Sequence, residues 1–114
     1  MDRTLTYRER IRRRPDFLIV QQRGRRTRGR FLTVFSRANG LDRNRLGIIA
    51  TRRLGGAVRR NRAKRLMREV FRHCKGQGGL DIVALLRPGF DEVAYSEIDA
   101  DYRATLERIT RHRS

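Results

Sequence analysis

The sequence predicts a single α+β domain, an α-β sandwich with the element order α-β-β-α-β-α and room for an extra short strand. The chain has 114 residues, a length that suits one domain. Hydrophobic residues make up 38%, enough for a modest core. Segments with helical and strand-like periodicity alternate along the chain. We therefore expect residues 1–114 to form one domain.

The chain begins with a basic segment, residues 1–14, which carries six arginines and no sustained apolar period. We expect a flexible arm that is ordered only by contact with a partner or with its own domain. Pro15 suits the first turn of a short helix that runs to about Gln22. The following residues, 24–30, read GRRTRGR and predict a basic turn that leaves room for a short strand.

Three further segments have the composition of strands. Residues 45–51 and 80–86 are rich in aliphatic residues, and the second is nearly continuously apolar, which predicts a strand buried on both faces. Asn39-Gly40 lies between the first two strands and is a hairpin signal. The first strand, residues 31–37, alternates between two faces, with Phe31, Thr33 and Phe35 on one and Leu32, Val34 and Ser36 on the other.

A long basic helix follows the glycine turn Gly55-Gly56 within residues 52–75. At about 100° per residue, its apolar side chains fall on one side, namely Ala63, Leu66, Met67, Val70, Phe71 and Cys74. We expect Leu66→Ala to cost about 2–5 kcal/mol by opening a cavity in the core. The last helix spans about 95–111, and its core stripe consists of Ile98, Tyr102, Leu106 and Ile109.

The charge of the chain points to a polyanion as its partner. The net charge is +17 and the pI is about 11.8. The polar side of the basic helix presents arginines at one-turn intervals, and their planar forks grip phosphate oxygens bidentately. The helix N-terminus adds unpaired N–H groups nearby. A merely solvated charged face is the alternative, but such a face normally interleaves acids and this one offers only Glu69.

No constellation for catalysis or metal binding is evident. His73 and His112 lack cysteine or carboxylate partners at ligand spacing, and the single cysteine, Cys74, falls on the apolar side of its helix. No run is apolar enough to span a membrane. The single cysteine is the usage expected in a reducing cytosol, so we expect a cytoplasmic protein. These observations favour a binding protein over a self-sufficient enzyme.

A composite motif makes the reading more specific. Residues 45–58 read RLGIIATRRLGGAV and residues 59–69 read RRNRAKRLMRE. The two together resemble the signature of the bacterial ribonuclease P protein subunit: a strand that ends in a basic pair, a Gly-Asn-Ala-Val-like turn, and Arg-Asn-Arg followed by Lys-Arg and Arg. The Pro-Asp-Phe near the N-terminus and the chain length also fit, so the resemblance covers essentially the whole chain.

The resemblance implies a fold and a function. The strand–helix–strand unit over about 45–86 would cross over with the unusual left hand. The protein would be an accessory RNA-binding subunit, with the catalytic RNA and precursor tRNA as partners and no small-molecule substrate or membrane. Catalysis of 5′-leader removal would belong to the RNA subunit and its bound Mg²⁺, with no protein catalytic residue and no cofactor or metal intrinsic to the protein.

The resemblance also assigns residues. Those that would contact the catalytic RNA belong to the basic helix: Arg59, Arg60, Asn61, Arg62, Lys64, Arg65 and Arg68. Those that would form a cleft for the single-stranded leader, between the first helix and the sheet, are Phe17, Leu32, Val34, Arg52 and Arg53. The chain departs from the family pattern at Gly56, where Asn is common. It departs again at Gln21 and Val34, where many relatives carry Phe and Tyr.

Two other classes of protein remain open on the sequence. A structural, ribosomal-type RNA-binding protein would have the same size and charge, but the composite motif argues against it. A stand-alone nuclease would need a histidine or carboxylate constellation that the sequence lacks. Co-purification with ribosomal subunits would favour the first alternative, and activity in the absence of all RNA would favour the second.

Overall fold

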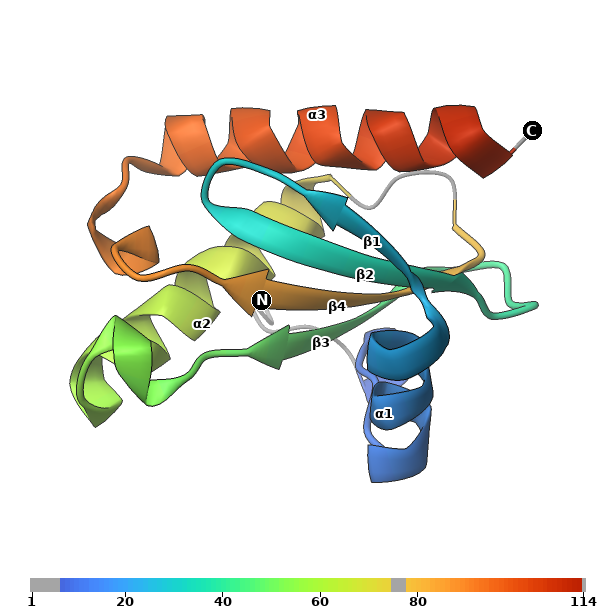
Figure 1. Ribbon diagram of the computed structural model, residues 1–114, viewed down its shortest axis with the longest axis horizontal. Coiled ribbons are helices and arrows are strands. Elements are labelled where there is room, and N and C mark those ends of the chain that lie inside the picture. The colour runs from blue at the N-terminus through green and yellow to red at the C-terminus, as the bar shows by residue number, and fades with distance from the viewer. Residues whose placement is uncertain (1–6, 75–77, 114) are drawn as a thin grey trace.

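The computed structural model describes residues 7–74 and 78–113, and among them the predicted element order is confirmed, including the extra short strand (Figure 1). Short 3₁₀ turns precede α1, α2 and α3 at Tyr7–Glu9, Arg52–Leu54 and Phe90–Glu92. The helices and strands are α1 (Arg14–Arg23), β1 (Arg25–Arg28), β2 (Leu32–Ala38), β3 (Arg45–Ile49), α2 (Ala57–His73), β4 (Leu80–Leu86) and α3 (Tyr95–Arg113).

The four strands form one sheet in the order β1-β2-β4-β3. β2 pairs antiparallel with both β1 and β4, whereas β3 pairs parallel with β4. The hairpin predicted at Asn39-Gly40 is therefore wrong, because β4 inserts between β2 and β3. Asn39 instead donates its side-chain amide to Asp81 Oδ1 at 2.9 Å and to the carbonyl of Arg43 at 3.1 Å. The hairpin of this fold is β1–β2.

The β3–α2–β4 unit has the left-handed crossover that the resemblance implied. β3 and β4 are parallel neighbours, and both arrows point to the left in Figure 1, with β4 above β3. α2 passes behind the sheet between them, which makes the connection left-handed. Parallel crossovers are right-handed in nearly all proteins, so general topology rules predict the opposite hand.

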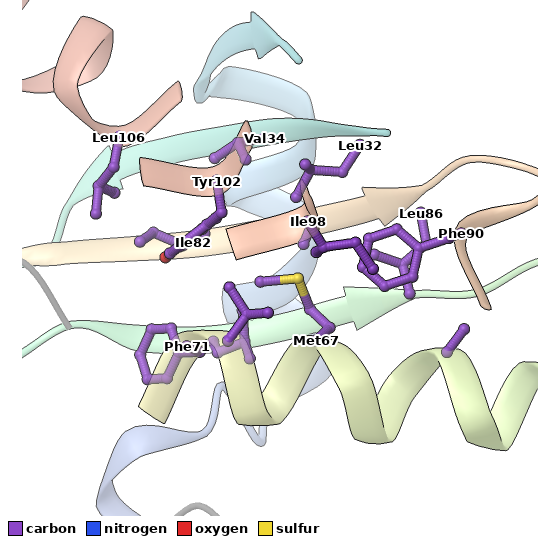
Figure 2. Close-up of a cluster of buried hydrophobic side chains, with 14 of the residues drawn as sticks. Leu32, Val34, Met67, Phe71, Ile82, Leu86, Phe90, Ile98, Tyr102 and Leu106 are labelled. Atoms are coloured by element: carbon purple, nitrogen blue, oxygen red, sulfur yellow. The ribbon is translucent and has the colours of Figure 1, made fainter. Parts of the chain in front are cut away.

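Two apolar clusters lie on the two faces of the sheet. The larger cluster packs α2 and α3 against one face, where Met67 and Phe71 of α2 meet Ile98 and Tyr102 of α3 (Figure 2). The smaller cluster packs α1 and the N-terminal segment against the other face through Ile11, Phe17, Val20, Phe35 and Val83. Because β4 contributes Ile82 to the first cluster and Val83 to the second, the predicted burial of this strand on both faces is confirmed.

Part of the basic N-terminal segment is held by the domain. The Ile11 N–H donates to the Leu46 carbonyl at 3.0 Å, and the Ile11 side chain is buried beneath α1. Arg14 is already the first residue of α1. Residues 7–14 are thus ordered by contact with their own domain, which is one of the two ways of ordering expected from the sequence, and one apolar side chain fixes the segment beside β3. Residues 1–6 lie outside the described residues.

Candidate nucleic-acid interface

The basic helix α2 is positioned by its apolar stripe. Ala63, Met67, Val70 and Phe71 are buried, while Leu66 is only half-buried and packs at the margin of the same cluster. This anchoring turns the opposite side of the helix to solvent. Asn61, Arg62 and Arg65 are exposed there, and Arg60, Lys64 and Arg68 are half-buried. Gly56 is the N-cap and makes no side-chain hydrogen bond, so the cap that an Asn would supply is missing.

One residue predicted to contact RNA, Arg59, also has a structural role. Arg59 forms a bidentate ion pair with Asp91, with Nε–Oδ2 at 2.9 Å and Nη2–Oδ1 at 3.1 Å, and its Nη2 lies 3.3 Å from Glu92. The Asp91 side chain is fully buried, and the hydrogen bond from Arg59 lowers the pKa of its carboxyl group. Arg59 therefore fastens the start of α2 to the turn before α3. Arg62 Nη1 lies 3.8 Å from the same carboxylate, but the Arg62 side chain remains mostly exposed.

A first pocket, the α2 pocket, opens beside β3 and has a volume of about 220 Å³. Three cations from two separate parts of the chain converge on it. Burial, followed by the charges of Arg10 and Arg65, lowers the pKa of Arg68. The Nε of Arg10 is buried without a hydrogen-bond partner. A phosphate bound in this pocket would accept a hydrogen bond from Arg10 Nε, and its negative charge would favour the charged form of Arg68. The lining residues are Arg10, Ile11, Phe17, Leu46, Gly47, Ile48, Lys64 and Arg68.

The position of the Phe17 ring in this pocket depends on the absence of a side chain at Gly47. A Cβ at Gly47 would lie 2.6 Å from Phe17 Cε2, so the ring covers the bare backbone of β3. We expect Gly47→Ala to displace the ring and to cost about 1–3 kcal/mol of stability. Urea denaturation would measure this loss. Unchanged stability of Gly47→Ala would contradict the packing described here.

A second and larger concavity, the sheet groove, has a volume of about 430 Å³ and lies on the α1 face of the sheet. The strand register explains its composition. Arg28, Thr33 and Leu85 are laterally paired across β1, β2 and β4, so their side chains point to one side. Within the described residues, none of the four arginines in the groove forms an ion pair. The lining residues are Arg26, Arg28, Thr33, Thr51, Arg53, Leu85, Leu86, Arg87 and Pro88.

The structure corrects the predicted cleft at two positions. Leu32 and Val34 are completely buried in the large cluster, on the face covered by α2 and α3. They therefore cannot line a cleft on the α1 face. For the same reason, the departure from the family pattern at Val34, where many relatives carry an aromatic residue, does not change the composition of that cleft. Arg53 lines the sheet groove and Phe17 lines the α2 pocket. Arg52 is exposed in the turn before α2 but lines neither.

Several site residues were missed from the sequence. Arg26 and Arg28 were recognised only as part of a basic turn, although their i, i+2 spacing places them on one face of a strand. Thr33 and Phe35 share the α1 face by the same alternation that was used for Leu32 and Val34. Nothing in the sequence brings Arg10 to α2, since that proximity depends on the bridge to Leu46.

Comparisons with known proteins agree with this fold and this distribution of charge. The ribonuclease P family model matches residues 5–110. The ribonuclease P protein component of Thermotoga maritima is 44% identical over 94 residues, which cover 81% of this chain and 80% of that protein. The protein component of Thermotoga petrophila is 41% identical over 115 residues, covering 96% and 98%.

Solved structures give the same answer. The chain superposes on the RNase P protein from Thermotoga maritima with a TM-score of 0.79 and 38% identity, covering 88% of this chain and 96% of that one. For the Staphylococcus aureus RNase P protein the TM-score is 0.77 at 29% identity, with 89% of this chain and 94% of that one covered.

No helix among the described residues is long and apolar enough to cross a membrane. The chain belongs to the bacterial ribonuclease P protein family, and it is an RNA-binding protein of tRNA processing.

Proposed function

We propose that this chain is the accessory subunit of a cytoplasmic ribonuclease P, in which α2 binds the catalytic RNA and the sheet groove binds the 5′ leader of precursor tRNA. The observation that carries the proposal is the pair of cationic concavities around one sheet. The α2 pocket continues the exposed arginine ladder of α2, while the sheet groove lies on the opposite face of the sheet from that helix. One protein can therefore contact two RNA segments at once.

The sheet groove has the properties that a single-stranded leader requires. Its floor is Thr33 and Leu85, which can contact sugars and base edges without selecting a sequence. Its rim carries arginines on β1, on the turn before α2 and at the end of β4. Because the recognised groups are phosphates, we expect binding with little sequence preference and a strong dependence on salt. Leader-binding residues proposed here are Arg26, Arg28, Arg53 and Arg87.

The chemistry of cleavage would belong to the RNA subunit. Mg²⁺ bound by that RNA would activate water and stabilise the leaving oxygen. This chain contributes charge, because its arginines neutralise phosphates that would otherwise repel one another when substrate meets the catalytic RNA. The residues of α2 that would face the catalytic RNA are Arg60, Asn61, Arg62, Lys64, Arg65 and Arg68. Arg59 acts indirectly, by holding the start of α2 to Asp91.

The test is cleavage of a precursor tRNA at low Mg²⁺ by a bacterial ribonuclease P RNA, with and without this protein. We expect cleavage to increase markedly with the protein present and the protein alone to be inactive. No gain with a correctly folded RNA would favour a structural RNA-binding protein of the ribosomal type. Cleavage by the protein alone would place the active site in the protein and refute the proposal.

A further inference from the structure

Hydrogen bonds from side chains of the C-terminal helix α3 hold the turn of the β1–β2 hairpin. The backbone N–H groups of Arg30 and Phe31 donate to the two carboxylate oxygens of Asp101, each at 2.9 Å. From about two turns further along α3, Arg108 Nη2 donates to the carbonyl of Arg28 at 2.7 Å. The turn lies against α3 in Figure 1 although the two are about 70 residues apart in sequence. Asp101 of α3 thus accepts hydrogen bonds from two backbone N–H groups of the turn, and Arg108 of α3 donates a hydrogen bond to a backbone carbonyl beside it.

Gly29 allows the turn to approach α3 closely enough for these hydrogen bonds. A Cβ at Gly29 would lie 2.8 Å from both Asp101 Oδ2 and Thr105 Oγ1. Any larger residue would have to displace either the turn or the Asp101 carboxylate. Thr105 is fully buried and its hydroxyl donates to the Asp101 carbonyl at 2.8 Å, which fixes the floor on which the turn rests. The contact is therefore closely packed on both sides.

The hairpin needs such a fixed point. β1 is an edge strand of four residues with only β2 beside it, and it buries no side chain fully. Its Arg26 and Arg28 face Arg53 and Arg87 across the sheet groove. Like charges at these positions repel one another, and in the described part of the chain no carboxylate pairs with them. Without an anchor, this repulsion favours a hairpin that moves outward and opens the groove.

The same turn also holds the opposite rim of the groove. The backbone N–H of Arg87 donates to the carbonyl of Phe31 at 3.1 Å. Asp101 therefore contacts a turn that connects two of the three segments carrying groove arginines, β1 and the end of β4. The carboxylate itself is directed at backbone N–H groups, so it does not need to contact RNA to influence binding.

We propose that Asp101, assisted by Arg108, is a positioning residue that sets the geometry of the sheet groove by holding the β1–β2 turn. This inference rests on the proposed function, since it assumes that the groove binds the leader. It assigns to α3 a part in substrate binding that requires no contact between this helix and RNA. Asp101 acts through Arg26 and Arg28, whose guanidinium groups it keeps at a fixed spacing from Arg53 and Arg87.

The test uses Asp101→Asn in the holoenzyme reconstituted with ribonuclease P RNA. Asparagine can accept one of the two N–H groups, but its amide donor opposes the other. We expect the dissociation constant for precursor tRNA with a long leader to rise by about three- to tenfold. With a leader of a single nucleotide, which cannot occupy the groove, we expect no change. Glu107→Gln is the matched control: it removes the same charge from α3 at an exposed pair with Arg111.

A second variant and a double mutant separate positioning from general destabilisation. Arg108→Gln should act in the same direction as Asp101→Asn with a smaller effect, and it serves as the test if the Asp101 variant does not fold. In an Arg28→Ala background, Asp101→Asn should weaken binding less than it does in the wild type. Equal losses for long and short leaders, or fully additive losses in the double mutant, would overturn the inference. A wild type that ignores leader length would instead refute the proposed function.

Discussion

Replacing Arg65 and Arg68 together with alanine is expected to weaken binding of the ribonuclease P RNA by about 100-fold, because each arginine is proposed to make a charge-assisted phosphate contact. The slope of log affinity against log salt concentration should become shallower by about one unit for each lost contact. Fluorescence titrations with labelled RNA at several salt concentrations would measure both quantities. The two side chains lie one turn apart on α2, where Arg65 is exposed and Arg68 is half-buried beside Arg10.

This double variant should remain folded. Arg65 is exposed and Arg68 is half-buried, and neither side chain belongs to the two apolar clusters that hold the domain together. The control is the double alanine variant of Arg37 and Arg111, which removes the same charge from exposed residues that lie outside α2 and line neither concavity. We expect it to bind RNA almost normally. If both double variants lost affinity equally, net charge alone would explain binding and α2 would have no special role.

Phe71→Ala is expected to lower the free energy of unfolding by about 3–5 kcal/mol. Phe71 is completely buried where α2 meets the sheet and α3, so its loss leaves a cavity that the rigid sheet cannot fill (Figure 2). Urea denaturation of the two proteins would give the difference. The loss is large relative to the stability of about 5–15 kcal/mol that is typical of single domains.

Leu66→Ala provides the comparison for Phe71→Ala. The sequence predicted about 2–5 kcal/mol for this change on the assumption of full burial. Leu66 is only half-buried, so the cost should fall at or below the lower end of that range. A larger loss for Leu66→Ala than for Phe71→Ala would mean that α2 is rotated relative to the arrangement described here.

The elements themselves were largely predictable because they depend on local pattern. The strand at 80–86 was predicted with its observed bounds, since a nearly continuous apolar run between glycines and Arg87-Pro88 has few other solutions. The apolar stripe of α2 was also predicted, because helical geometry decides which side chains share a face. The family motif then supplied the left-handed crossover, which no general rule would have favoured.

The site was predicted less completely than the fold. The exposed ladder of Asn61, Arg62 and Arg65 follows directly from the helix, and it lies where the sequence placed it. Arg59 looked equivalent to its neighbours, but it pairs with Asp91, which is 32 residues away in sequence. No local pattern reveals such a partner. The charge of a residue can be read from the sequence, whereas the availability of that charge to RNA depends on its surroundings in the fold.

The sequence by itself determined the class of this protein: one small α+β domain, strongly basic, with an arginine helix and an apolar strand that must be buried on both faces. Only the tertiary structure decided which face of β2 meets α1. Alternation divides Leu32 and Val34 from Thr33 and Phe35, but both sets are compatible with a core, and burial under α2 and α3 chose between them. Strand periodicity has two equivalent faces, and only long-range packing distinguishes them.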